Sequence, residues 1–448
     1  MATFVPWCSG RTGVFDTLSP GSNPGGTTIK TMNTRRFWLL ILIVAVVRLA
    51  LMVTIPVFEP SEARYAAISA NMARSGDYVV PHFTYDLEYQ SFDGKPPLVF
   101  QAGGLFCEVF GVCEFAVRLF PFLSAALLLL ILYRTVRRLV DAETARLSVV
   151  ICATSVAFFA ASGIAMTDMT LACCVAGALL GYRCFLEGYA WRDAALVMVL
   201  MGAGMIVKGP VALVMFGLPV LVDAIVNHRW KGIFNWKWVA TAPLFFVIAV
   251  PWFILVEQRN PGAVWYFFYN ENFMRFISHD YGDKYGAGRE AFRGVSILWA
   301  VVVTLPWALF VPIRRINWRA FEWLALLAIV GFWCLTSRVL IYYLFPIIPL
   351  FAAWIVCVGD RSRMARFAPA CTALACVVVL GALLGGMFFS VKMQGAKTPF
   401  HPFQNHYAYE FYHGRKSEAE LMKYRDARDL FLKQRAARKA AEKKDVAK

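Results

Sequence analysis

The stretch RRFWLLILIVAVVRLALMVTIPVFEPSEARYAAISANMARSGD, residues 35–77, decides the fold class. Two arginines precede an apolar run, 37–56, which has about the 20 residues that a helix needs to cross a bilayer. A polar segment with a helical pattern follows at once. Because basic residues before a first span favour a cytoplasmic N-terminus, we expect residues 57–77 to emerge on the opposite face of the membrane.

The composition of the whole chain is that of a polytopic membrane protein. Its 448 residues are 59% hydrophobic and only 17% charged, with a mean hydropathy of +0.56, whereas soluble domains carry about 25% charged residues. We predict an all-α transmembrane bundle of about 11–13 spans, with juxtamembrane helices in the first extracytoplasmic loop. The apolar runs behind this prediction are 37–56, 115–133, 143–163, 168–186, 193–208, 210–227, 237–256, 292–313, 319–336, 339–358 and 367–391.

The net charge of +16 fits a membrane protein without a nucleic-acid partner. Arginine and lysine cluster in the short connections between apolar runs and in the tail, as cytoplasmic loops and membrane-surface segments require. The clusters share one face if the run 98–112, short and with a glycine pair, lies in the interface instead of crossing. Eleven spans then place the basic tail on the far face, so either the count is off by one or the tail is an exception.

The same pattern predicts three regions. Residues 1–34 are expected to be a disordered extension, or to include an upstream start before Met32. Residues 35–392 form the transmembrane domain, with large extracytoplasmic loops at 57–97 and 257–291. Residues 393–448 form a basic tail in which 416–443 predicts an amphipathic surface helix. Most of the eleven cysteines lie in apolar runs, and Cys107 and Cys113 either pair in an oxidising compartment or stay thiols.

The polar part of the opening stretch predicts a juxtamembrane helix. Ser61 is placed to cap a helix over 62–75, and Gly76 to end it. Ala66, Ile68 and Met72 then share an apolar side. Taken alone, this pattern is most simply an interfacial helix with solvated charges.

The rest of the first loop and two later positions add candidate site residues. Lys95 is the last charge before the apolar run at 98, where a cation binds a lipid phosphate or simply snorkels to the headgroups. Asp168 stands between two apolar spans, where a carboxylate is costly and a functional candidate unless it only caps a helix. The aromatic-rich loop 257–291 holds Arg275, which suits a second phosphate contact. Further cavity candidates are His82, Asp93 and His279.

Several motifs agree in order and spacing with a known family. The chain resembles the PMT/aminoarabinose-transferase group of integral-membrane GT-C glycosyltransferases over roughly 37–360. The motifs that carry the resemblance are Ser-Glu-Ala-Arg-Tyr-Ala at 61–66, Ser-Gly-Asp-Tyr at 75–78, Gly-Lys-Pro-Pro-Leu at 94–98, Phe-Gly-Val-Cys-Glu-Phe-Ala-Val-Arg-Leu at 110–119, Thr-Asp at 167–168, Lys-Gly-Pro at 208–210, Asn-Glu-Asn at 270–272 with Arg-Phe at 275–276, and Tyr-Leu-Phe-Pro at 343–346.

The resemblance implies a membrane enzyme that takes a sugar from a polyprenyl-phosphate carrier. The acceptor expected from it is lipid A or lipopolysaccharide core, and the sugar is aminoarabinose, galacturonic acid or a hexose. The implied location is the bacterial inner membrane, with the site on the periplasmic face. A protein O-mannosyltransferase-like enzyme, a lipid transporter and a non-catalytic membrane protein are the alternatives. Inverted repeats and broken midplane helices, typical of transporters, are not seen.

The resemblance also implies residue roles. The family's first loop opens with adjacent Asp-Glu, but here Ser61 holds the first position, so Glu62 is the predicted catalytic carboxylate and Glu59 an outside candidate. Asp168 matches a second carboxylate of the same cavity. The residues that match donor-phosphate positions are Lys95, Arg275, Tyr343, Arg64 and Tyr65.

The chemistry expected from these roles needs no cofactor beyond the donor. Phosphate is a good leaving group, so direct attack by the acceptor predicts inversion at the anomeric carbon. The sequence has no Asp-x-Asp signature and no His/Cys cluster with zinc spacing, and a divalent ion held by the carboxylates stays an open alternative. The expected partners are the lipid-linked donor, a lipid A or glycan acceptor and membrane lipids; the oligomeric state is left open.

Overall fold

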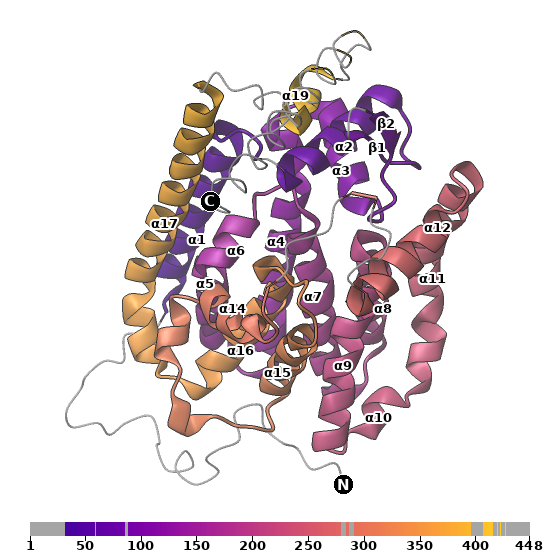
Figure 1. Cartoon of the computed structure of the whole chain (residues 1–448). Helices are drawn as coiled ribbons and strands as arrows, with labels where there is room; N and C mark the ends of the chain where they lie inside the picture. The colour runs from indigo at the N-terminus through magenta and orange to yellow at the C-terminus, as the bar shows by residue number, and fades with distance from the viewer. Residues whose placement is uncertain are drawn as a thin grey trace, which may run out of the picture.

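The computed structural model describes residues 32–58, 60–85, 88–278, 284–285, 291–395 and 406–414, together with residues 419, 422 and 426. Within them the chain is a bundle of helices with one small hairpin (Figure 1). The expectations for residues 1–31, for Glu59, for His279 and for most of the predicted surface helix 416–443 fall outside the described residues. Helix α1 begins at Thr34, the last residue of the predicted extension, and Asn33 caps it by accepting a hydrogen bond from the Arg36 backbone N–H at 2.8 Å.

The multi-span membrane class is confirmed, whereas the number of spans stays a prediction. Within the described residues, five helices are long and apolar enough to cross a membrane: α1 (Thr34–Thr54), α4 (Glu114–Leu139), α7 (Thr167–Gly188), α11 (Trp236–Arg259) and α17 (Arg361–Gly395), the last over Arg361–Gly385. The same part of the chain has four shorter apolar helices, α3 (Leu98–Phe110), α9 (Pro210–Val226), α15 (Phe321–Cys334) and α16 (Ile347–Val358).

The remaining elements connect these helices or cover one end of the bundle. They are α2 (Ser61–Ser75), β1 (His82–Tyr85), β2 (Glu88–Ser91), α5 (Ala142–Thr154), α6 (Val156–Ala161), α8 (Trp191–Lys208), α10 (Trp230–Ile233), α12 (Ala263–Trp265), the π-helix η1 (Tyr266–Met274), α13 (Arg275–Ile277), α14 (Val295–Val303), the 3₁₀ turns η2 (Trp307–Phe310), η3 (Ile313–Arg315) and η4 (Ile341–Leu344), and α19 (His406–His413).

Helix α7 forms the centre of the bundle. Of its most apolar 18-residue window, 94% is buried, against 28% for α1 and 17% for α11. Its small residues, such as Gly177 and Ala178, allow neighbouring helices to approach closely. The outer helices instead expose large apolar side chains, including Val239 and Val247 at 77% and 72%. This inside-out distribution suits a surface that contacts lipid chains, which are as apolar as the side chains themselves.

Three predicted spans are wrong as continuous helices. The run 339–358 begins with the 3₁₀ turn η4 and is α-helical only over α16. The run 143–163 is divided at Ser155, whose extended backbone ends α5 and begins α6. The run 292–313 is helical only over α14, and turns and the short η2 follow it. Pro306 and Pro312 lack the backbone N–H that a continuing helix requires, and hydropathy alone does not register that loss.

The first loop packs over one end of the bundle. The predicted juxtamembrane helix is confirmed as α2, and Gly76 ends it with φ of 69°. The capping role predicted for Ser61 is wrong, because Pro60 occupies the N-cap and Ser61 is the first helical residue. The predicted apolar side is buried, but so is most of the helix, which packs against α3 and β1.

A short antiparallel hairpin interrupts the otherwise helical architecture. Strand β1 pairs with β2 so that His82 faces Ser91 and Thr84 faces Tyr89. Aromatic and β-branched residues alternate here with polar ones, which favours a strand. The hairpin ends four residues before Lys95 and therefore sets the course of the chain toward that lysine.

The described part of the tail returns to the same end as the first loop. Helix α19 lies against α2 (Figure 1). Phe411 belongs to the small hydrophobic core that also contains Ala66, Phe83 and Phe100. The described tail segment 406–414 thus lies at the end of the bundle that carries the first loop, and the span count behind the charge argument stays a prediction.

Candidate active site

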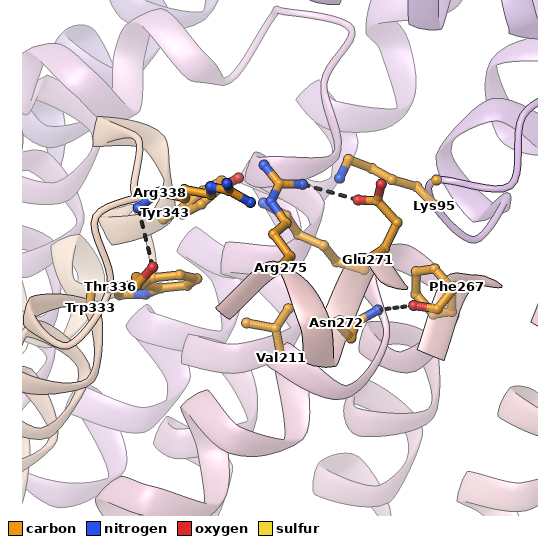
Figure 2. Close-up of a pocket in the computed structure, with 12 residues that line it drawn as sticks. Lys95, Val211, Phe267, Glu271, Asn272, Arg275, Trp333, Thr336, Arg338 and Tyr343 are labelled. Atoms are coloured by element: carbon orange, nitrogen blue, oxygen red, sulfur yellow. Dashed lines mark hydrogen bonds and ion pairs between the residues drawn. The ribbon is translucent and has the colours of Figure 1, made fainter. Parts of the chain in front are cut away.

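A cavity with an excess of positive charge lies beneath the first loop. It encloses about 490 Å³, part of it open to solvent, and four cationic side chains and one carboxylate line it. Figure 2 shows the lining side chains converging from several elements. The lining residues are Gly94, Lys95, Lys208, Val211, Phe267, Glu271, Asn272, Arg275, Trp333, Thr336, Arg338 and Tyr343.

Lys95 enters the cavity from the first loop. It stands between the β1–β2 hairpin and α3, and Pro96 and Pro97 fix the backbone that follows it. Among the described residues, none forms a hydrogen bond or ion pair with its ammonium group. Desolvation in the cavity, followed by the positive charge of Lys208, lowers the pKa of Lys95 to about 8. An anion bound beside Lys95 would offset that unfavourable environment.

Lys208 and Asp168 form a buried ion pair behind the cavity. The Lys208 Nζ lies 2.5 Å from Asp168 Oδ1, and both side chains are less than a tenth exposed. Asp168 stands in the first turn of α7 and Lys208 in the last turn of α8, so each charge is placed at the helix end that stabilises it. Lys208 Nζ also sits 4.1 Å from the centre of the Tyr343 ring, a cation–π distance.

Gly209 is the turn that delivers Lys208 to the cavity. Its φ of 77° lies in the left-handed region, and a methyl group added to it would overlap the Phe267 ring of the cavity wall. The turn between α8 and α9 therefore requires glycine for both backbone conformation and space.

Replacing Gly209 with alanine is expected to lower the free energy of unfolding by about 1–3 kcal/mol, because backbone strain adds to the overlap with Phe267. The thermal midpoint in detergent would measure this loss. Gly217→Ala in α9 is the matched control, because nothing lies within 4 Å of its added methyl. Equal midpoints for the two variants would contradict the prediction.

The π-helix η1 supplies a second ion pair. Arg275 Nη1 donates to Glu271 Oε2 at 3.0 Å, and the Tyr266 hydroxyl donates to Glu271 Oε1 at 3.3 Å. Asn272 turns back to the Phe267 carbonyl (Figure 2). π-Helical turns are rare and frequently mark functional sites. Here the wider turn aligns Glu271 and Arg275 along the cavity.

The connection between α15 and α16 closes the cavity on its remaining side. The Arg338 backbone N–H donates to Thr336 Oγ1 at 3.2 Å, and Trp333 stacks near Tyr343 with ring centres 4.7 Å apart. Arg338 is only 7% exposed. A largely buried guanidinium in the cavity lining suits an anionic group such as a phosphate, because its planar set of N–H donors can bind two phosphate oxygens at once.

Glu62, the predicted catalytic carboxylate, lies outside the cavity lining. Its two oxygens accept four hydrogen bonds: from Arg118 Nε at 2.7 Å and Nη2 at 3.0 Å, and from the backbone N–H groups of Phe58 and Ala165 at 3.0 Å each. Four bonds use the whole accepting capacity of a carboxylate. Ala165 precedes Asp168 by three residues. Glu62 therefore fixes the position of the segment that leads to the Asp168–Lys208 pair.

Lys95, Arg275 and Tyr343 therefore meet in the cavity, and Asp168 lies one contact behind it. Arg64 and Tyr65 lie beside it: the Arg64 guanidinium stands 5.4 Å from the Tyr65 ring centre and 5.5 Å from that of Phe92.

Two other predicted residues serve the loops. His82 Nδ1 lies 2.9 Å from the Val80 carbonyl oxygen, and its ring stacks on Tyr89. Asp93 accepts hydrogen bonds from Asn260 and Lys284 at 2.8 and 2.9 Å, which ties the first large loop to the second. The chemical roles predicted for all these side chains stay predictions.

Three charged residues of the site had no predicted role: Lys208, Glu271 and Arg338. Two of them stand at positions where the sequence itself marks a charge as costly. Lys208 ends an apolar helix before Gly-Pro, and Arg338 stands between two apolar runs, so both are costly charges at membrane depth. Their common cavity could not be inferred, because they come from segments 130 residues apart.

The carboxylates do not gather into a metal site in the part of the chain that the structure describes. No group of three or more His, Cys, Asp or Glu side chains there could hold a metal ion. Cys107 and Cys113 are both free thiols.

Known proteins with similar sequences are glycosyltransferases by name. The family model described as dolichyl-phosphate-mannose-protein mannosyltransferase matches residues 94–255. The undecaprenyl phosphate-α-4-amino-4-deoxy-L-arabinose arabinosyl transferase of Edwardsiella ictaluri is 30% identical over 268 residues, 58% of this chain and 47% of that protein. The protein of the same name from Pectobacterium atrosepticum is 28% identical over 352 residues, 72% and 61% of the two chains. The chain thus spans about half to three-fifths of the length of these relatives.

The fold has a solved counterpart. ArnT from Cupriavidus metallidurans, crystallised with undecaprenyl phosphate, superposes with a TM-score of 0.64 at 23% identity over 84% of this chain and 75% of that one. The apo crystal structure of the same protein gives the same TM-score. This likeness concerns the fold alone.

Proposed function

We propose that the chain is a membrane glycosyltransferase of the PMT/aminoarabinose-transferase type, to which its similarity to the family model and to the curated relatives points, and that it transfers a sugar from a polyprenyl-phosphate carrier. The proposed acceptor is lipid A or lipopolysaccharide core, and the sugar is aminoarabinose, galacturonic acid or a hexose. The enzyme is proposed to reside in a bacterial inner membrane with the cavity open to the periplasm.

The observation that carries this proposal is the unpaired cation in the cavity. Lys95 has no partner among the described residues, while Arg275 is directed toward the same space and pairs with Glu271. A polyprenyl phosphodiester brings one negative charge, a lipid tail that stays in the bilayer, and a sugar that stacks on aromatic rings. A neutral ligand would leave the half-buried charge of Lys95 uncompensated.

The proposed reaction is a direct displacement. A lone pair of an acceptor oxygen attacks the anomeric carbon while the bond from that carbon to the phosphate oxygen breaks. The carrier phosphate leaves with the bonding electrons, and Lys95, Arg275 and Tyr343 stabilise the charge that develops on it. Asp168 is proposed to take the acceptor proton where the acceptor is a hydroxyl. Glu62 is proposed to act indirectly, by holding the segment before α7.

Mass spectrometry of envelope glycolipids tests the proposal. Cells with the wild-type chain are expected to carry a sugar-sized mass increment on lipid A or core that is absent without the chain and strongly reduced in Asp168→Asn. Asp426→Asn, an exposed change of the same chemistry, should leave the increment intact. No difference among the four strains would overturn the lipid acceptor.

A protein acceptor is the second candidate, because the matching family model is named for protein mannosyltransferases. Mannosylated envelope proteins that depend on the wild-type chain, together with unchanged glycolipids, would favour it.

Binding of the donor is expected to weaken as the pH rises through about 8. A protonated Lys95 attracts the phosphodiester, and its pKa of about 8 in the free protein means that the charge is lost above that pH. The groups facing it are Lys208, Arg275, Glu271 and Tyr343. The apparent dissociation constant should rise up to about tenfold per pH unit above 8. In Lys95→Arg this rise should disappear, because a guanidinium stays charged. The same rise in both proteins would show that a group other than Lys95 causes the pH dependence.

A further inference from the structure

Helix α19 places two buried side chains, Glu410 and Phe411, against the first loop. Glu410 is 3% exposed and Phe411 is fully buried. A carboxylate is rarely placed in a protein interior without partners that compensate its desolvation. Both residues face α2 and β1.

The partners of Glu410 come from two elements of the first loop. Its oxygens accept the Thr84 backbone N–H at 3.0 and 3.2 Å and Asn71 Nδ2 at 2.7 Å. In return Arg74 donates to the backbone carbonyls of Glu410 and Phe411, at 3.0 and 2.6 Å. The Glu410 carboxylate thus accepts from the first loop, and the Arg74 guanidinium of that loop donates to the α19 backbone. These charge-assisted bonds make the contact specific.

The contact leads to the cavity through the hairpin. Thr84 lies in β1 and pairs with Tyr89 of β2. Its neighbour Phe83 packs edge-on against Phe92, with ring centres 5.2 Å apart. Gly94, next to Lys95, leaves no more than about 3 Å between an added methyl and the Phe92 ring. The position of Lys95 therefore depends on a packed path that begins at the Thr84 N–H.

We propose that α19 is an intramolecular ligand of the first loop, and that Glu410 is a positioning residue that holds Lys95 in the cavity through the β1–β2 hairpin. Only the identity of the anion at Lys95 rests on the proposed function. The contact of α19 with the first loop, called the clamp below, involves this chain alone. It can therefore be tested without donor or acceptor.

Hydrogen exchange of the purified full chain tests the contact. In Glu410→Gln the side chain keeps its shape but loses its charge and one accepting oxygen. Amides of residues 82–91 should then exchange at least about tenfold faster. Asp426→Asn, the same change at an exposed tail position, should leave them unchanged. Asn71→Ala, which removes the Nδ2 bonds to Glu410 and to the His82 carbonyl but leaves the two Thr84 bonds, should shift exchange in the same direction by less. Unchanged exchange in Glu410→Gln would overturn the clamp.

Titration of Lys95 tests the positioning role. The rate at which an amine-reactive reagent acylates Lys95, followed against pH, reports its pKa directly. That pKa should rise in Glu410→Gln from about 8 toward about 10.4, the value of a solvated lysine. Faster exchange with an unchanged Lys95 titration would show that the tail only stabilises the hairpin, and would overturn the positioning role.

Donor binding separates this inference from the proposed function. Polyprenyl phosphate should bind Glu410→Gln several-fold more weakly than the wild type. If the wild type itself fails to bind polyprenyl phosphate, the proposed function is wrong, and exchange and Lys95 titration still decide the clamp.

Discussion

Replacing Lys95 with methionine is expected to reduce kcat/KM for the lipid-linked donor by about 10²–10³-fold, the usual effect of removing one preorganised group that stabilises transition-state charge. The side chain keeps its length and apolar stem but loses its charge. The phosphate then meets a cavity in which Lys208 and Arg275 are already paired with carboxylates. Kinetics with a purified donor would measure the loss.

The matched control is Lys231→Met, which removes an exposed lysine from the connection between α9 and α11. It should change kcat/KM by less than about twofold. Lys95→Arg should retain more activity than Lys95→Met, because it keeps the charge but changes the geometry of the contact. Full activity in Lys95→Met would remove Lys95 from the mechanism and leave Arg275 and Arg338 as the phosphate contacts.

Replacing Arg118 with methionine is expected to lower the free energy of unfolding by about 3–5 kcal/mol, because it leaves the Glu62 carboxylate buried without its counter-charge. The Arg118 and Glu62 side chains are each 3% exposed. Arg118 also donates to the carbonyls of Met52, Ile55 and Pro56, which closes the end of α1. A large fall in the thermal midpoint, or loss of folded protein, is the expected observation.

The double variant Glu62→Gln/Arg118→Met should recover part of that loss, because the buried charge is removed together with its partner. The same double variant tests the two roles of Glu62. If Glu62 acts by holding the Ala165 segment, the recovered protein should keep measurable transfer. A folded double variant with no transfer at all would instead support Glu62 as a catalytic carboxylate.

The site residues that could be predicted from the sequence are charges in apolar surroundings, because the free-energy cost of such a charge can be judged from the neighbouring residues alone. Lys95 and Asp168 are charges at the edges of apolar runs, so each was a candidate from its own neighbourhood. Arg275 and Tyr343 came from motif resemblance. Glu62 shows the limit of this reasoning: its place in a motif suggested chemistry, but its partner Arg118 lies 56 residues away, and only that partner shows that all its lone pairs are used.

The sequence by itself determined the membrane class, the existence of most helices and the end of α2 at Gly76, because hydropathy, periodicity and a positive φ are properties of short segments. It could not determine which segments become neighbours, since many arrangements bury the same apolar faces.

Tertiary structure alone decided that Lys208 and Arg338 share a cavity with Lys95. It also decided that the hairpin exists and that Glu410 reaches Thr84 across 326 residues. Buried charges need partners, and long-range packing chooses those partners.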